Sequence, residues 1–186
     1  MNEMARIAVA PADGFKARFT AQEFLRMCDA GAFEDWKVEL IEGELERMQL
    51  PQNNHAMRQA QVVVRLAQAL GVERIRGEAG IDLGNDTLVS ADAAVLGGEI
   101  DGDRRFVPAD LTLVVEIAET TLRRDLGMKR RKYAAAGIPL YWVVDGNHAV
   151  VHVHANPVDG DYIDVHTVRF GEPLALPGTD ATIVLS

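Results

Sequence analysis

Apolar and polar positions along the chain follow two periods, one helical and one typical of strands, separated by short turns. Near the N-terminus, Thr20 is followed three residues later by Glu23. This capping box predicts a short helix that ends near Gly31. Residues 38–50 (VELIEGELERMQL) then predict a β-hairpin, two short strands joined at Glu42-Gly43.

The middle of the chain, from about Asn54 to Asp145, is expected to form the core of the fold. Stop signals at Gly71 and Gly137 end its two helical segments, and Gly84-Asn85-Asp86 forms a hairpin turn between two strands. The predicted order is helix 54–70, strand 77–83, strand 87–96, strand 111–119, helix 121–136 and strand 141–145. This αβββαβ order predicts a mixed α/β fold.

The end of the chain is rich in strand patterns. Residues 148–155, 162–170 and 181–185 read as strands, with turns at Asp159-Gly160 and Pro177-Gly178. We expect the N-terminal and C-terminal hairpins to extend or cover the central sheet. The 186 residues fit a single domain, in which residues 1–18 form a loose N-terminal arm.

The amino-acid composition indicates what kind of protein this is and in which cellular compartment it is expected. The chain is 48% hydrophobic and 25% charged, as is ordinary for a globular protein. No apolar run approaches the roughly 20 residues that span a bilayer, and the N-terminus lacks the basic n-region of a signal peptide. The single cysteine, Cys28, cannot form an internal disulfide, so we expect a cytoplasmic protein. Its position in an amphipathic helix favours packing over a nucleophilic role.

The net charge of -9 argues against a broad basic surface for nucleic acid. It does not exclude a local one, because residues 123–132 (RRDLGMKRRK) hold six of the 19 basic residues. That segment is either a solvated helix face or a local basic surface.

Two acidic residues interrupt strands that otherwise read as buried. Glu116 lies within LTLVVEIAE, where both faces are mostly apolar, and Asp92 lies in the small-residue strand TLVSADAAVL. Glu116 could lie at a strand end near solvent. Otherwise, two carboxylates on neighbouring strands would repel unless a cation lay between them, and Mg²⁺ or Mn²⁺ is the usual choice for oxygen ligands.

Lys129 lies within the apolar stripe of the helix that follows Glu116. At about 100° per residue the stripe consists of Leu122, Leu126, Lys129, Tyr133 and Ala136, whereas Arg123, Arg124, Arg130 and Arg131 lie elsewhere. Lys129 either snorkels to water or directs its ammonium at the Glu116 end of the sheet. Asp125, one turn earlier, could hold it through an i,i+4 contact.

A zinc site is a rival reading of the C-terminal strands. His148, His152 and His154 share one strand face, with His166 and Asp164 on a possible hairpin partner. An exposed polar strand face explains them better. The two tryptophans, Trp36 and Trp142, are read as core or sheet-edge residues rather than as stacking platforms for nucleic acid.

The sequence resembles the Uma2 family (DUF820) of PD-(D/E)XK restriction-endonuclease-like nucleases. The resemblance rests on VELIEGE (38–44), Pro51 and His55, the AD of SADAAVL, and VVEIAETT. Its most specific part is D-x3-K-x3-Y-x3-GI-P-x-YW-x2-D, read as Asp125, Lys129, Tyr133, Gly137, Ile138, Pro139, Tyr141, Trp142 and Asp145.

The resemblance implies a restriction-endonuclease-like core and two metal-binding acids, Asp92 and Glu116. The motif's proline is Ala91 here, and the lysine expected two residues after Glu116 is Ala118. In the family that lysine often looks shifted to the following helix, where Lys129 matches it. An acidic residue that often precedes the YW pair is Leu140 here.

Three further positions match the family and are expected to play supporting parts. Glu39 and Glu44 match acidic positions of the N-terminal hairpin, with metal contact and structural roles both open. His55 could contact phosphate or cap its own helix. The resulting hypothesis is an endonuclease that uses Mg²⁺ or Mn²⁺ to hydrolyse DNA, acting as a homodimer. The alternative is a non-catalytic nucleic-acid- or protein-binding member of the same fold.

Overall fold

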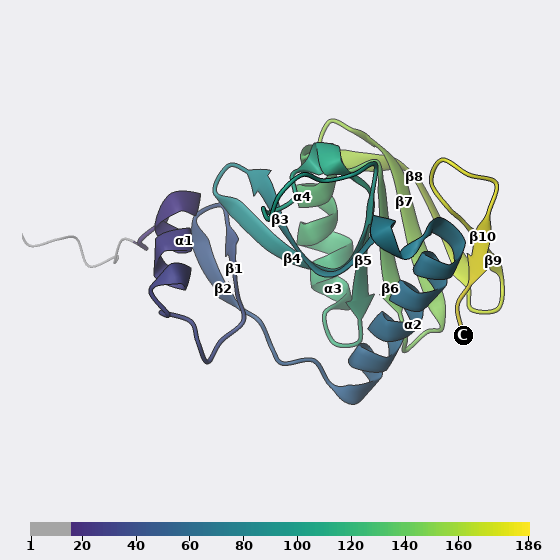
Figure 1. The fold of residues 1–186 in the computed structure, drawn as a ribbon. Helices are drawn as coiled ribbons and strands as arrows, with labels where there is room; N and C mark the ends of the chain where they lie inside the picture. The colour runs from purple at the N-terminus through teal and green to yellow at the C-terminus, as the bar shows by residue number, and fades with distance from the viewer. Residues whose placement is uncertain (1–15) are drawn as a thin grey trace, which may run out of the picture.

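A mixed sheet forms the centre of the protein (Figure 1). The computed structural model describes residues 16–186. Strand order is β2-β1-β4-β5-β6-β7-β8, and β3 pairs with β4 outside this path. The strands are β1 Val38–Ile41, β2 Glu44–Arg47, β3 Ile75–Gly84, β4 Thr87–Leu96, β5 Leu111–Ala118, β6 Leu140–Asp145, β7 Val150–Val158 and β8 Asp161–Arg169. The mixed α/β class predicted from the sequence is confirmed.

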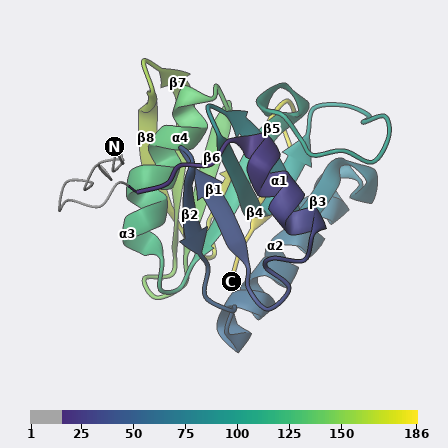
Figure 2. The same ribbon diagram turned by 90° about the vertical axis from the view of Figure 1, so that its left-hand side faces the viewer.

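Helices cover both faces of the sheet (Figure 2). Helix α2 (Asn53–Leu70) packs on one face together with the small sheet of β9 (Pro173–Ala175) and β10 (Thr182–Val184). The opposite face carries a helical segment of three parts, α3 (Leu122–Arg124), a π-helical turn η3 (Asp125–Lys129) and α4 (Arg130–Ala135). The remaining helices are α1 (Ala21–Asp29), η1 (Val72–Arg74) and η2 (Pro108–Asp110).

The predicted turns form as their residues require. The capping box of Thr20 and Glu23 opens α1. Asn85 and Asp86, at the β3–β4 turn, have φ of 47° and 49°, the left-handed conformation that a tight hairpin needs. Strand β5 runs parallel to β6, so the chain between them must cross over, and the helical segment 122–135 makes that crossover.

Along one of its two edges, strand β4 pairs with two different strands, β1 near its start and β5 near its end. β3 pairs along the whole of its far edge, from Thr87 to Val95. On the near edge, β1 pairs only at Leu88, whereas β5 pairs from Ala93 onward. Residues 89–92 therefore lie at a fork between β1 and β5. Their backbone groups on this edge need partners other than a neighbouring strand.

Three further expectations concern the N-terminal arm, membrane-spanning helices and Cys28. The expected loose arm, residues 1–18, lies outside the described residues except for its last three. No helix within residues 16–186 is long and apolar enough to cross a membrane. Cys28 is exposed rather than packed.

The histidine face does not form a zinc site. Within residues 16–186 there is no group of three or more His, Cys, Asp or Glu side chains suited to a metal ion. The His148 ring contacts the buried Asp145 at 2.7 Å, whereas His154 packs against the rings of both Tyr141 and Tyr162. Burial lowers the pKa of His154 to about 4, so this ring is neutral at pH 7.

Candidate active site

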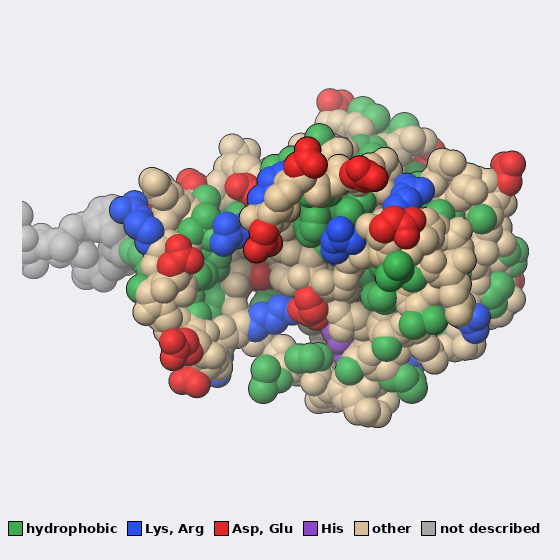
Figure 3. All heavy atoms as spheres, viewed as in Figure 1, with side chains coloured by type: hydrophobic (Ala, Val, Ile, Leu, Met, Phe, Trp, Pro, Cys, Tyr) green, Lys and Arg blue, Asp and Glu red, His purple; other side chains and the backbone are tan. Residues whose placement is uncertain are grey.

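A cavity of about 360 Å³ opens where β4 forks. Its walls come from the β1–β2 hairpin, the first turn of α2, the C-terminal half of β5 and the helical segment 122–129. Figure 3 shows the hollow between the lobe of α1, β1 and β2 and the rest of the molecule. All three residues predicted as the centre of the site, Asp92, Glu116 and Lys129, line this cavity.

Side chains supply the hydrogen bonds that the fork leaves open. Glu39 Oε1 accepts from the Ser90 amide at 2.9 Å, and Asp92 Oδ2 accepts from the Ile117 amide at 2.7 Å. The Ser90 carbonyl accepts from Lys129 Nζ at 3.4 Å. These ionisable side chains are therefore fixed by the backbone of the sheet, which orients them more firmly than a surface loop could.

Strand alternation breaks at Asp92. Ala91 packs with the cluster under α4, whereas Ala93, two residues later, packs with the cluster under α2. Glu78, skipped in the pairing of β3 with this part of β4, has a φ of 50°. This irregularity turns Asp92 toward the fork, and such local breaks in a ladder are common beside active sites.

The Lys129 ammonium lies between two buried carboxylates. Its Nζ is 2.8 Å from Glu116 Oε1 and 3.1 Å from Glu39 Oε1, and its side chain is only 2% exposed. Burial by itself would lower the pKa of Lys129, but the two carboxylates outweigh burial and raise it. Lys129 therefore points at the sheet and does not snorkel to water.

Glu116 is held through one of its two oxygens. Oε1 accepts from Lys129 and, at 2.6 Å, from the hydroxyl of Tyr133, which is fully buried. Within residues 16–186, Oε2 accepts no hydrogen bond from the protein. Burial raises the pKa of Glu116 to about 8, against the opposing attraction of Lys129.

The two oxygens of Asp92 differ in the same way. Oδ2 accepts from Ile117 and lies 3.2 Å from His55 Nε2, and no described residue donates a hydrogen bond to Oδ1. His55 lies in the first turn of α2 and lines the cavity, but it does not cap the helix. Its hydrogen bond to Asp92 raises the pKa of the imidazole.

Asp92 and Glu116 are the two acids of this cavity that could hold a divalent cation, although within residues 16–186 no group of three or more His, Cys, Asp or Glu side chains is arranged to hold one. Each offers one oxygen without a partner among the described residues, and both line the cavity. Mg²⁺ is commonly held by one or two carboxylates together with water and substrate phosphate, so a third protein carboxylate is not required. The donors are all oxygen, which suits Mg²⁺ or Mn²⁺ better than Zn²⁺.

Glu39 is not available as a metal ligand. Its Oε1 accepts from Ser90 and Lys129, and its Oε2 accepts from Arg124 Nη2 at 2.5 Å. Burial would raise the pKa of Glu39, but Lys129 and Arg124 outweigh burial and lower it, so the carboxylate is ionised at pH 7. Of the two roles left open for Glu39, the structure supports the positioning one.

Arg124 is a site residue that the helical stripe missed. Besides Glu39 it contacts Glu46, at 2.8 Å, and these two acids lie directly opposite each other on β1 and β2. Like charges in that position are destabilising unless a cation lies between them. In the predicted hairpin, Glu39 and Glu46 already lie opposite each other, and this pairing could have indicated that a basic side chain must lie between them.

Glu44 and Asp125, the other acidic residues expected to support the site, make different contacts from those expected. Glu44 does not line the cavity and pairs at the surface with Arg18 at 3.2 Å, because it lies two pairs nearer the hairpin turn than Glu46. Asp125 lines the cavity but makes no ion pair with Lys129. Its carboxylate instead accepts from Thr121 Oγ1 at 2.5 Å. Burial raises the pKa of Asp125.

Comparison with known proteins places the chain in a family. A family model described as "Uma2: Putative restriction endonuclease" matches residues 21–185. The chain belongs to the Uma2 family. Family membership supports a nuclease-type function and confirms the resemblance found in the sequence. The match covers the hairpin, the fork and the helical segment, and thus every residue described at the cavity.

Solved structures give the Uma2 fold independently. A crystal structure from Anabaena variabilis ATCC 29413, described as "a putative nuclease belonging to DUF820", is 21% identical to this chain with a TM-score of 0.64. The alignment covers 87% of this chain and 89% of that one. No curated protein matches this Uma2 chain.

Proposed function

We propose that this Uma2 protein is a nuclease that hydrolyses phosphodiester bonds of DNA with Mg²⁺ or Mn²⁺ held by Asp92 and Glu116. The observation that carries the proposal is the pair of carboxylates facing one cavity. Each is fixed to the fold through one oxygen and free at the other, with the Lys129 ammonium 2.8 Å from Glu116.

In the proposed reaction, the acids, Lys129 and Tyr133 each have a separate role. A divalent cation in this site supplies a water of lowered pKa and polarises a phosphoryl oxygen. Lys129, held charged by Glu39 and Glu116, places a positive charge where negative charge grows on the phosphate. Tyr133, whose pKa burial raises well above its usual value, remains a hydrogen-bond donor and fixes Glu116.

The rival function is a non-catalytic binding protein with the same fold. The net charge of -9 favours it, because a nuclease must approach phosphates. Incubating the purified protein with linear DNA, circular DNA and RNA, with Mg²⁺, Mn²⁺ or EDTA, separates the two. Cleavage of DNA that requires the metal supports the nuclease. Binding without cleavage under every metal condition would support the rival.

Replacing Tyr133 with phenylalanine should weaken Mn²⁺ binding by about 10- to 100-fold, as is typical when a partner of a metal ligand is removed. The reason is the loss of the 2.6 Å hydrogen bond that fixes Glu116. Isothermal titration calorimetry measures the affinity directly. The matched control is Tyr162→Phe, which removes a buried hydroxyl that donates to the Ile138 carbonyl instead. Equal Mn²⁺ affinity in both variants would remove Tyr133 from the site.

Mn²⁺ affinity should rise with pH up to about 8 and then level off. The pKa of Glu116 lies near 8 without metal, so below that pH a cation must displace a proton. For one proton, affinity changes by about tenfold per pH unit. Titrations at pH 6, 7 and 8 in buffers of different ionisation enthalpy measure both affinity and proton release.

His55 is a second group that can release a proton on metal binding, because its hydrogen bond to Asp92 raises its pKa. The His55→Gln variant therefore serves as the control for that measurement. A pH dependence that persists in this variant belongs to Glu116. If proton release at pH 7 vanished with His55, the assignment to Glu116 would be wrong.

A further inference from the structure

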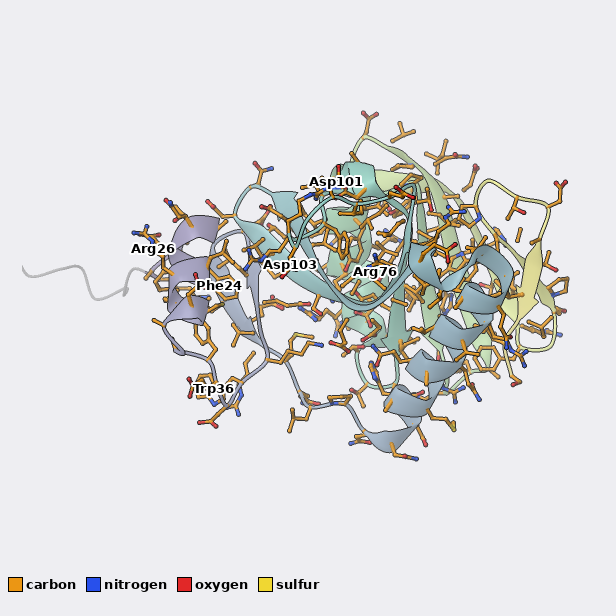
Figure 4. The ribbon with its side chains drawn as sticks, in the orientation of Figure 1. Phe24, Arg26, Trp36, Arg76, Asp101 and Asp103 are labelled. Carbon is orange, nitrogen blue, oxygen red and sulfur yellow. The ribbon has the colours of Figure 1, made fainter. Side chains whose placement is uncertain are left out.

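Trp36 presents an aromatic ring beside the cavity. It lies between α1 and β1, next to the cavity-lining Lys37, and is 51% exposed, whereas Trp142 is fully buried. The guanidinium of Arg47 lies over the ring with its Cζ 4.3 Å from the centroid. Figure 4 shows Trp36 at the lower end of the lobe formed by α1, β1 and β2. Of the two expected places, core or sheet edge, Trp36 therefore occupies the edge, beside the terminal strand β2.

Arg47 differs from the other cations of the cavity in its partners. Lys37 pairs with Glu78, Arg124 with Glu39 and Glu46, and Lys129 with Glu39 and Glu116. Arg47 also lines the cavity, yet it makes no ion pair with any carboxylate of residues 16–186. Its charge is therefore available to an anion that enters from this side.

A guanidinium that has no carboxylate partner and covers only one face of an exposed aromatic ring suits a nucleotide. Arginine binds phosphate through a planar set of donors, and an aromatic face stacks on a base of any sequence. The net charge of the chain is -9, so a local cation matters here more than a general basic surface.

We propose that Trp36 and Arg47 form a binding platform for an unpaired nucleotide, so that the cavity takes single-stranded nucleic acid. This inference rests on the proposed nuclease function and specifies its substrate. A base can stack on Trp36 only when it is not stacked within a duplex. Seven consecutive residues, 46–52, line the cavity and include Arg47, so the platform continues directly into the cavity wall.

Tryptophan fluorescence tests the platform without any cleavage. The protein has only two tryptophans, and the buried Trp142 provides a constant background. In EDTA, a 12-nucleotide oligothymidylate should quench the emission, whereas a 12-base-pair duplex should not. The Trp36→Phe variant should lose the quenching but keep most of the affinity, measured by the anisotropy of a labelled oligonucleotide.

Further variants separate stacking from charge. Trp36→Ala should weaken binding of the single strand by about 10- to 100-fold, the usual effect of losing one stacked base. Arg47→Ala should reduce the salt dependence of binding by about 0.7 in the log–log slope, as expected for one phosphate contact on a single strand. Arg26→Ala, on the exposed face of α1, is the control and should change neither.

Three results would overturn the platform: tighter binding of duplex than of single strand, unchanged affinity in Trp36→Ala, or equal effects of Arg26→Ala and Arg47→Ala. Any of these results would mean that Trp36 and Arg47 contact each other at the surface but do not bind a nucleotide. Failure of the nuclease proposal has a different outcome. Single-strand binding that depends on Trp36, with no cleavage in any metal, supports the platform and rejects catalysis.

Discussion

Replacing Asp92 with asparagine should reduce metal-dependent cleavage of DNA by about 10³-fold or more. The variant keeps an oxygen that can accept from the Ile117 amide, but it loses the negative charge that would hold the cation. Stability should stay the same or rise slightly, because the change relieves repulsion between Asp92 and the buried Glu116. Cleavage of circular single-stranded and duplex DNA, together with urea denaturation on the same preparation, measures both quantities.

The matched control for this change is Asp103→Asn. Asp103 lies in the exposed loop between β4 and η2, and the substitution alters net charge by the same amount (Figure 4). It should leave cleavage and stability unchanged. If Asp92→Asn cleaved DNA at the rate of the wild type, or if Asp103→Asn lost activity equally, Asp92 would have no place in the site.

Replacing Lys129 with methionine should lower the free energy of unfolding by about 3–5 kcal/mol in addition to abolishing cleavage. The ammonium is the shared partner of two buried carboxylates, and removing one member of a buried ion pair leaves an uncompensated charge. Loss of activity in this variant is therefore not evidence of catalysis by itself. Asp92→Asn is the cleaner test of mechanism.

Two comparisons show whether this loss comes from the buried charges. Arg131→Met, at an exposed position two residues later in the segment, should cost less than about 0.5 kcal/mol. Adding Glu39→Gln to Lys129→Met should restore part of the lost stability, because Glu39 is ionised at pH 7 and loses a buried partner in the single variant. If the double variant were no more stable than the single one, the Lys129–Glu39 pair would not be coupled as its 3.1 Å separation implies.

The sequence predicts the sheet and the helices well because their signals are local. Caps, glycine stops and turn residues depend on neighbours within a few positions, as at Thr20 and Gly71. The positions of Asp92, Glu116 and Lys129 were also accessible, because a charge within an apolar strand or stripe is conspicuous. The sequence alone could not predict which oxygen of each carboxylate accepts hydrogen bonds from the protein and which one stays free.

The residues that were misplaced depend on pairing between distant segments. Arg124 lies ahead of the π-helical turn, where i→i+5 bonding interrupts the 100° rotation on which the stripe was drawn. Glu44 and Glu46 lie two strand pairs apart along β2, and only Glu46 lies opposite Glu39 and within reach of Arg124. The sequence left open whether each tryptophan lies in the core or at a sheet edge, and only the structure places Trp36 at the exposed edge and Trp142 in the core.

The π-helical turn makes the crossover between β5 and β6 sensitive to its length. Such a turn amounts to an α-helix with one additional residue, so deleting a single residue such as Gly127 would restore regular α-helical spacing. A second additional residue is not absorbed in this way and would rotate the C-terminal part of the helical segment by about 100° relative to its N-terminal part. Lys129 and Arg124 could then no longer reach their carboxylates together. Further insertions, more than substitutions, should therefore be the changes that this stretch of the gene cannot tolerate.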